Sequence, residues 1–155
     1  MKGYTGILCL LMAAAILLSG CGMLIKEPKI EVKNVALESI DLSTINLLVT
    51  LSIDNPNPVS INLKSINFDV YYQKGSDWVF ISHGERGSVT IKPGLNEVPV
   101  PVSIKTSALP GAVLGALTRG EITLQIKGTV SPDFFGISPQ VPFSTVTTIP
   151  LNVGG

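Results

Sequence analysis

Residues 45–53 read INLLVTLSI, and this stretch decides the fold. Every second residue from Ile45 to Ile53 is apolar, and the residues between them are polar except Leu48. Such alternation puts successive side chains on opposite faces of a strand, whereas a helix needs apolar residues every three or four positions. The stretch therefore predicts a β-strand with one face in a hydrophobic core and the other in water.

The strand is followed directly by Asn55-Pro56-Asn57-Pro58. Two prolines remove two backbone donors, and asparagine side chains readily form turns with their own backbone. We interpret Asn55, Pro56 and Asn57 as a structural motif that ends the strand. A role in binding a partner is the alternative.

The same period of two continues through most of the chain. Alternation over 61–72 changes phase at Lys64-Ser65, which predicts a β-bulge or bend there. A second clean stripe covers 98–104, and its polar side holds Pro99 and Pro101. Prolines at alternate positions predict a strand at the edge of a sheet, where their missing donors face solvent.

Turns and one helix complete the pattern. A short strand is expected over 78–82, and glycines predict a turn over 84–87. Only 107–117 has helical spacing, with Ser107 as a cap and Gly120 as a stop. Seven or eight strands with one short α-helix predict an all-β fold. The best match is an antiparallel β-sandwich of the fibronectin-III or immunoglobulin type with Greek-key connections.

The N-terminus has the features of an export signal. Twelve apolar residues, Ile7 to Leu18, rise about 18 Å as a helix, which is too short for a bilayer core of about 30 Å. The following Leu18-Ser19-Gly20-Cys21 resembles the lipobox of prolipoproteins, in which the cysteine receives the lipid. An ordinary signal peptide cut near Gly20, or a short buried helix, are the alternatives.

This interpretation divides the chain into three parts. Residues 1–20 are a lipoprotein signal peptide, 21–29 hold the lipidated Cys21 and a short tether, and 30–153 form the sandwich domain. Removing 1–20 from the 155-residue chain also removes Cys9, so Cys21 becomes the only mature cysteine. No internal disulfide is then possible, and stability must come from the core.

Charge and composition limit the classes of partner. The chain has 11 basic and 11 acidic residues, and neither sign is clustered. Without a basic surface we expect no nucleic acid partner. An apolar content of 45% argues for an ordered domain rather than a disordered hydrophilic protectant.

Residues that carry chemistry are few. His83 is the single histidine, so a site with several histidine ligands is excluded, and we expect no metal and no cofactor. His83 has two serines nearby, Ser82 and Ser88, but the sequence has no nucleophile-elbow motif. Three further acids, Asp54, Asp69 and Asp77, are isolated on the polar faces of the predicted strands. The sequence therefore predicts a protein that is not an enzyme.

One loop holds an unusual aromatic pair. Phe134-Phe135-Gly136 lies between Pro132 and Pro139, in a segment without clear alternation. An exposed contact patch and a buried plug of the loop are equally consistent with this pattern.

Several short segments together resemble the late embryogenesis abundant type 2 domain, also called the WHy (water stress and hypersensitive response) domain. They are the Asn55-Pro56-Asn57 strand end, the 66–72 strand, the 108–117 helix, the run 120–128 and Val141-Pro142-Phe143. In this order they span residues 28–151. The resemblance implies a fibronectin-III-like sandwich with one helix and an association with desiccation and other stresses. It offers no catalytic motif, and members of this family often carry a lipoprotein signal.

We therefore expect a non-enzymatic lipoprotein that protects or binds proteins during desiccation or other envelope stress. Its partners would be the membrane, through the lipid anchor, and protein partners or stress-denatured proteins. We expect a monomer on the periplasmic or extracellular face of the cell membrane or outer membrane. The alternative is an immunoglobulin-like interaction, assembly or carrier module of the envelope.

Overall fold

A computed structural model describes residues 25–109, 111 and 120–151 of the chain. This part of the chain forms eight strands and one turn of 3-10 helix, η1 (Thr106–Ala108). The strands are β1 (Lys29–Ile40), β2 (Thr44–Asn55), β3 (Ile61–Lys74), β4 (Asp77–Arg86), β5 (Val89–Ile91), β6 (Gly94–Lys105), β7 (Glu121–Asp133) and β8 (Val141–Pro150).

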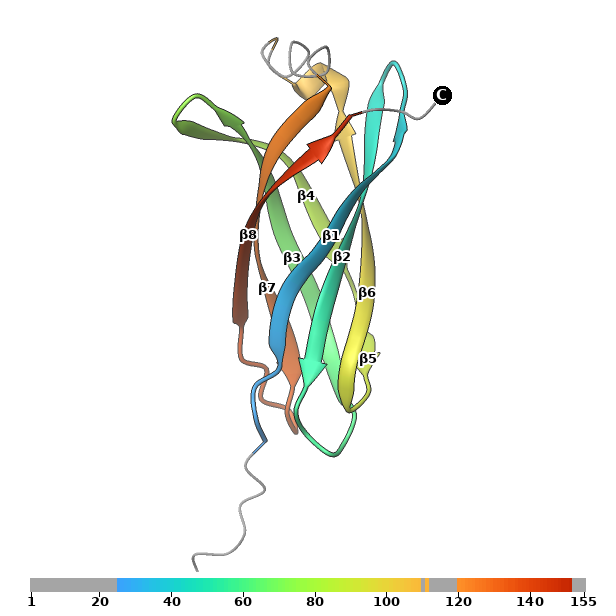
Figure 1. The fold of residues 1–155 in the computed structure, drawn as a ribbon. Helices are drawn as coiled ribbons and strands as arrows, with labels where there is room; N and C mark the ends of the chain where they lie inside the picture. The colour runs from blue at the N-terminus through green and yellow to red at the C-terminus, as the bar shows by residue number, and fades with distance from the viewer. Residues whose placement is uncertain (1–24, 110, 112–119, 152–155) are drawn as a thin grey trace, which may run out of the picture.

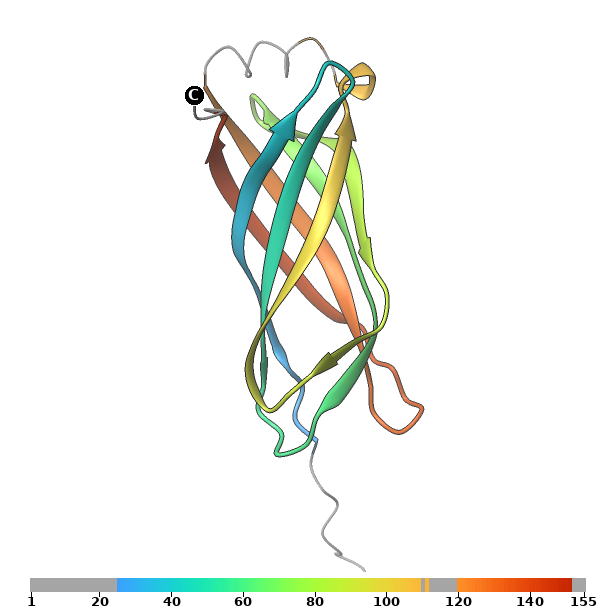
Figure 2. The ribbon, with the colours of Figure 1, turned by 90° about the vertical axis from the view of Figure 1, so that its right-hand side faces the viewer.

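The strands form two antiparallel sheets that pack face to face (Figures 1 and 2). One sheet has the order β1-β2-β6, and the other has the order β4-β3-β7-β8, with β5 paired to the end of β3. The connections β2–β3, β5–β6 and β6–β7 pass from one sheet to the other, as in a Greek-key sandwich. The predicted antiparallel β-sandwich is confirmed.

The core lies between the sheets and follows the alternation seen in the sequence. In β2, the five apolar residues of the stripe 45–53 are at most 4% exposed, and their neighbours are half-buried. The opposite sheet contributes Phe68, whose ring packs edge-on against Phe143 with centroids 6.1 Å apart. The hydrophobic effect on these inward faces is the main force that holds the two sheets together.

Two finer predictions about the strands are confirmed. Among the described strands, β6 pairs with β2 alone and is an edge strand, so Pro99 and Pro101 remove no donor needed by a second neighbour. The register of β3 against β7 shifts between Leu63 and Ser65, where the sequence changes phase. Such a shift lets one strand keep its apolar residues inside before and after the irregularity.

The prediction of a turn over 84–87 is wrong for residues 84–86, because β4 continues through Gly84 to Arg86. Gly84 pairs with Phe68, and a Cβ at Gly84 would lie 2.3 Å from the tip of the Phe68 ring. Glycine here makes room for an aromatic side chain on the neighbouring strand rather than bending the chain.

The expected α-helix over 107–117 falls mostly outside the described residues. Its first residues, Ser107 and Ala108, belong to η1. Among the described residues, the structure contains no helix that is long and apolar enough to cross a membrane.

Candidate functional site

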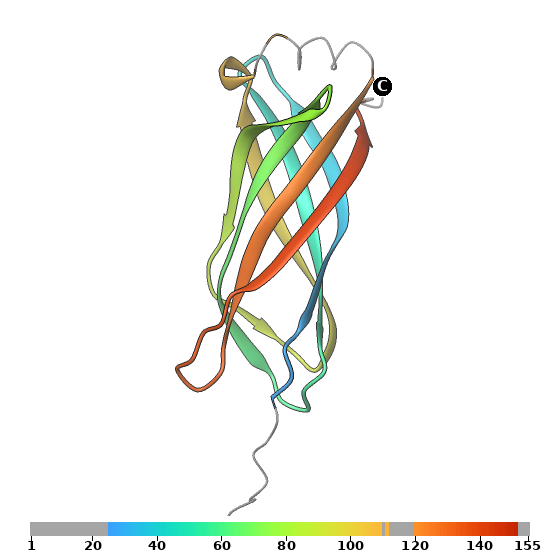
Figure 3. The ribbon, with the colours of Figure 1, turned by 90° about the vertical axis from the view of Figure 1, so that its left-hand side faces the viewer.

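The chain enters the sandwich at one end, which we call the entry pole. Residues 25–28 lead into β1 there, and the pole is formed by the loops 56–60, 92–93 and 134–140 (Figure 3). The strand β8 runs away from this pole and ends at the opposite one (Figure 1). The entry pole also contains Asn55, Pro56 and Asn57, and these residues form the first part of the candidate site.

Asn55 is the last residue of β2, and its side chain is 1% exposed. Its amide nitrogen Nδ2 donates to the carbonyl oxygen of Val59 (2.9 Å) and, at 3.4 Å, to that of Ile91. Its oxygen Oδ1 accepts from the backbone N–H and the side-chain Nδ2 of Asn57, both at 3.0 Å. The buried amide therefore closes the loop after β2 and ties it to the end of β5.

Asn57 is 5% exposed and bonds to the entering chain. Its Oδ1 accepts from the backbone N–H of Lys26, and its Nδ2 donates to the Lys26 carbonyl, both at 2.7 Å. This pair of bonds imitates one rung of a β-ladder with a side chain in place of a second strand. Pro56 lies exposed between the two asparagines, and its ring fixes the backbone φ at this position. The side-chain amides of Asn55 and Asn57 on either side of it are both buried.

The contact with Asn57 shortens the tether expected over 21–29. Lys26 is already bonded to the sandwich, Pro28 is buried, and β1 begins at Lys29. Cys21, the residue expected to carry the lipid, lies outside the described residues. Four peptide bonds separate it from Ile25, the first residue that the structure describes.

The loop with the aromatic pair forms a small hairpin at the same pole. Backbone bonds join Phe134 and Ile137 in both directions (2.8 and 3.0 Å), leaving Phe135-Gly136 as a two-residue turn. The N–H of Gly136 donates to Oδ1 of Asp133 at 3.0 Å. Phe135 is 86% exposed at the tip, so the loop presents this ring to its surroundings and does not bury it as a plug.

A shallow groove connects the hairpin to the entering chain. It is lined by Ile25, Val59, Ile61, Phe134 and Phe135, together with the polar Ser60, Asn62 and Asp133. The sequence alone gave no sign that Val59 and Ile25 would meet the aromatic pair, because the three segments are far apart along the chain.

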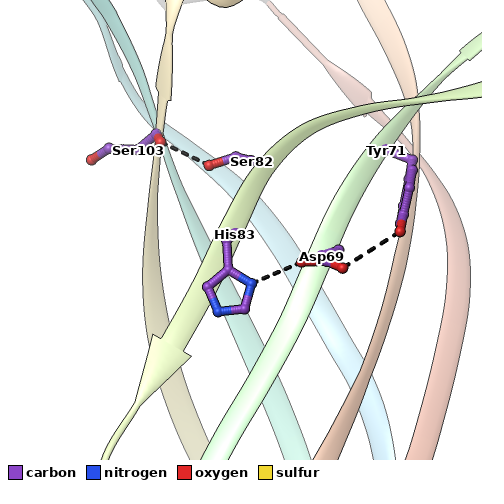
Figure 4. A network of polar contacts seen from close by, with 5 residues as sticks. All are labelled: Asp69, Tyr71, Ser82, His83 and Ser103. Atoms are coloured by element: carbon purple, nitrogen blue, oxygen red, sulfur yellow. Dashed lines mark hydrogen bonds and ion pairs between the residues drawn. The ribbon is translucent and has the colours of Figure 1, made fainter.

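The side chains with catalytic potential lie elsewhere and face different ways (Figure 4). His83 is on the outer face of β4, and its Nδ1 lies 2.8 Å from Oδ1 of Asp69 on β3. Ser82 points to the opposite face and donates to the carbonyl oxygen of Ser103 on β6 at 2.8 Å. Because neighbouring residues of a strand alternate, Ser82 and His83 do not form a nucleophile and base pair.

The three aspartates considered in the sequence are also separated from one another. Asp69 is engaged by His83 and Tyr71, whereas Asp54 lies on β2 and Asp77 begins β4. Within 25–109, 111 and 120–151, no three His, Cys, Asp or Glu residues are grouped so that they could hold a metal ion. The fold instead brings together Asn55 and Asn57, which we call the polar lock, and the apolar side chains around them.

Comparison with known proteins gives matches over most of the chain. Residues 50–146 match the sequence model of a family described as late embryogenesis abundant protein, LEA_2. The chain is 31% identical over 137 residues to MJ1138, an uncharacterized protein of Methanocaldococcus jannaschii. That match covers 86% of this chain and 76% of the relative.

Two solved structures share the fold. The solution structure of AT1g01470 from Arabidopsis thaliana superposes with a TM-score of 0.65 at 21% identity, covering 82% of this chain and 83% of the other. A crystal structure of a protein from Archaeoglobus fulgidus has a TM-score of 0.56 at 12% identity, covering 81% and 95%. At such identities the likeness concerns the fold alone.

Proposed function

Because the chain belongs to the late embryogenesis abundant protein family LEA_2, we propose that it is a lipid-anchored, non-enzymatic envelope protein of the WHy type that protects or binds other proteins during water stress. Membership of the family suggests a role in desiccation or related stress. The lipid would be attached to Cys21, and the domain would stand on the extracytoplasmic side of the cell membrane or outer membrane.

One observation carries this proposal: the chain is locked to the sandwich only a few residues after Cys21. The two bonds from Asn57 hold Lys26, and Asn55 holds Asn57 in turn. A lipid on Cys21 would therefore keep the whole domain close to the bilayer surface. Such a position suits a protein that acts on its neighbours in the envelope.

The proposed mechanism is weak contact with partly unfolded proteins or with membrane surfaces as water is lost. A non-enzymatic role agrees with the side-chain geometry, because the hydroxyl of Ser82 is engaged by a backbone carbonyl and His83 faces the other way. Since the domain has no disulfide available to it, its rigid core must resist the same stress.

The anchor is tested first, by the substitution Cys21→Ser in the full chain. We expect the protein to move from the membrane fraction to the soluble or secreted fraction, and the N-terminal peptide to lose the mass of the lipid. Cys9→Ser is the matched control, because it changes the other cysteine of the chain and should leave membrane retention unchanged. Continued membrane retention after Cys21→Ser, together with no lipid mass on the N-terminal peptide of the unsubstituted chain, would count against lipidation.

Protection is tested by drying or freezing a labile enzyme with the purified mature chain or with an equal mass of albumin. We expect more enzyme activity to survive with the chain than with albumin. Equal survival would remove specific protection. In that case, capture of one stoichiometric protein from solubilised envelopes would favour the alternative, an interaction or assembly module.

A further inference from the structure

Exposed apolar side chains are gathered at the entry pole. Three of the large exposed hydrophobic residues in the described chain lie together beside the groove: Val59 (44% exposed), Phe135 (86%) and Ile137 (73%). We call these three residues the apolar patch. Single exposed hydrophobic residues are common on soluble proteins, but a group at one end of a domain points to an interaction.

The backbone at the tip of the hairpin gives a second and independent sign. Phe135 has φ +52° and Gly136 has φ +91°, so both residues of the turn are left-handed. A two-residue turn of this kind favours Asn-Gly, and a bulky residue with positive φ is a genuine outlier. Neither the turn nor the core of the domain requires a phenylalanine at position 135. Backbone strain at such an exposed residue points to a role outside the domain.

We propose that the apolar patch lies on the lipid bilayer and is a second membrane contact beside the lipid on Cys21. This inference rests on the anchor proposed above. Cys21 precedes Ile25 by four residues, which span at most about 14 Å when extended. Because Ile25 lines the same groove as Val59 and Phe135, a lipid on Cys21 holds the patch close to the membrane.

The charges around the patch indicate the kind of lipid contact. Lys64 pairs with Asp133 beside the hairpin at 3.7 Å, and the exposed Lys26 is followed by the exposed Glu27. Lys29 lies opposite Asp54 in the β1–β2 register, and Lys92 of the loop 92–93 is also exposed. Lysines and carboxylates are therefore interspersed around the pole, which lacks the dense cluster of basic residues that recognises anionic headgroups. The contact is therefore apolar, with Phe135 and Ile137 entering the boundary between headgroups and acyl chains.

Two contacts orient the domain, whereas a single lipid would let it turn freely. With the entry pole on the membrane, the opposite pole with Leu42 and the β3–β4 turn points away from it (Figure 1). The outer faces of both sheets remain available to proteins in the envelope.

The experiment uses tryptophan fluorescence as a reporter in the full chain. The substitution Trp78→Phe first removes the chain's single tryptophan, and one new tryptophan is then introduced. Ile137→Trp reports on the patch, and Leu42→Trp reports on the opposite pole. The purified mature protein is reconstituted in phosphatidylcholine vesicles with brominated acyl chains. We expect the indole at position 137 to emit at shorter wavelength and to be quenched, and the indole at position 42 to emit as in water.

The reporter at position 137 is then combined with Phe135→Asn, or with Leu42→Asn as the matched control. Burying one phenylalanine side chain shifts a partition equilibrium roughly tenfold or more, so Phe135→Asn should reduce the membrane-inserted fraction strongly. Leu42→Asn should leave it unchanged. Because asparagine suits the left-handed turn, Phe135→Asn should not lower the melting temperature, and a loss of quenching cannot then be blamed on unfolding.

Three outcomes would overturn the proposal. Equal quenching at positions 137 and 42 would mean that the domain has no preferred pole on the membrane. A strong dependence on added phosphatidylglycerol or on salt would mean that charge carries the contact. A spectral shift without vesicles that grows with protein concentration would mean that a second copy of the chain covers the patch.

Failure of the anchor is distinguished from failure of the patch by the mass of the N-terminal peptide. An unmodified Cys21 defeats the proposed anchor. The same purified chain is then mixed with preformed vesicles, so that the contact of the patch is measured without a lipid anchor. Quenching at position 137 supports the lipid contact of the patch, and absence of quenching overturns the proposed contact.

Discussion

Replacing Asn55 by alanine should destabilise the whole domain, although the residue lies at one end of it. The substitution removes an amide that is 1% exposed and engaged on both sides. It leaves the carbonyl of Val59 and the backbone N–H of Asn57 without the partners that they have at 2.9 and 3.0 Å. Water cannot fully replace these bonds as long as the loop after β2 stays closed.

The magnitude follows from the number of bonds. Three contacts of Asn55 are at or below 3.0 Å, and the fourth, to Ile91, is 3.4 Å long and adds little. At about 1 kcal/mol each, the three bonds contribute about 3 kcal/mol to the free energy of unfolding. This loss lowers the ratio of folded to unfolded protein by more than about a hundredfold. For a domain of this size it corresponds to a fall of about 10 °C in the melting temperature.

Urea unfolding followed by Trp78 fluorescence and by circular dichroism measures the change, with the midpoint falling by about 1–2 M. Asn62→Ala is the matched control, because Asn62 is exposed and accepts one bond, from Thr90 at 2.9 Å. We expect the control to cost less than about 0.5 kcal/mol. If Asn55→Ala costs no more than Asn62→Ala, the polar lock does not stabilise the fold and our reading of the motif is refuted.

Two further substitutions test particular contacts. Asn57→Ala should speed tryptic cleavage after Lys26 severalfold, because the two 2.7 Å bonds that hold this backbone are lost; an unchanged cleavage rate would show that the entering chain is held by other contacts. Gly128→Ala should cost about 2 kcal/mol or more, because the new Cβ would lie 2.2 Å from a backbone oxygen of β3 and must push the strands apart. Gly87→Ala meets no atom within 4 Å and serves as the control in the same urea titration; equal midpoints for the two glycine variants would contradict the steric argument.

Much of the architecture could be predicted from neighbouring residues alone. The stripe 45–53, the phase change at Lys64-Ser65 and the prolines of 98–104 were enough to predict a strand, a bulge and a sheet edge. Each of these features depends on the alternation of side chains along one strand. That alternation is a local property, and the order of residues along the chain contains all of it.

Gly84 is a residue whose role could not be predicted from its neighbours in the sequence. Its position in a glycine-rich stretch predicted a turn, but the residue that explains it, Phe68, is on the neighbouring strand. Whether a glycine bends a chain or makes room for a ring depends on a contact between segments. Such a contact is invisible until the register of the strands is known.

The sequence by itself determined the class of the fold, because strand periodicity is a linear feature. The predicted export signal and the predicted lipid on Cys21 also rest on the sequence alone, because signal motifs are linear features. Only the tertiary structure decided what Asn55 and Asn57 hold and where Phe135 points. Asn57 bonds to a residue 31 positions earlier in the chain, and the exposure of Phe135 follows from a hairpin that ends beside that same segment. Hydrogen bonds and burial are set by residues that meet only after folding, so the entry pole became recognisable as a site only in three dimensions.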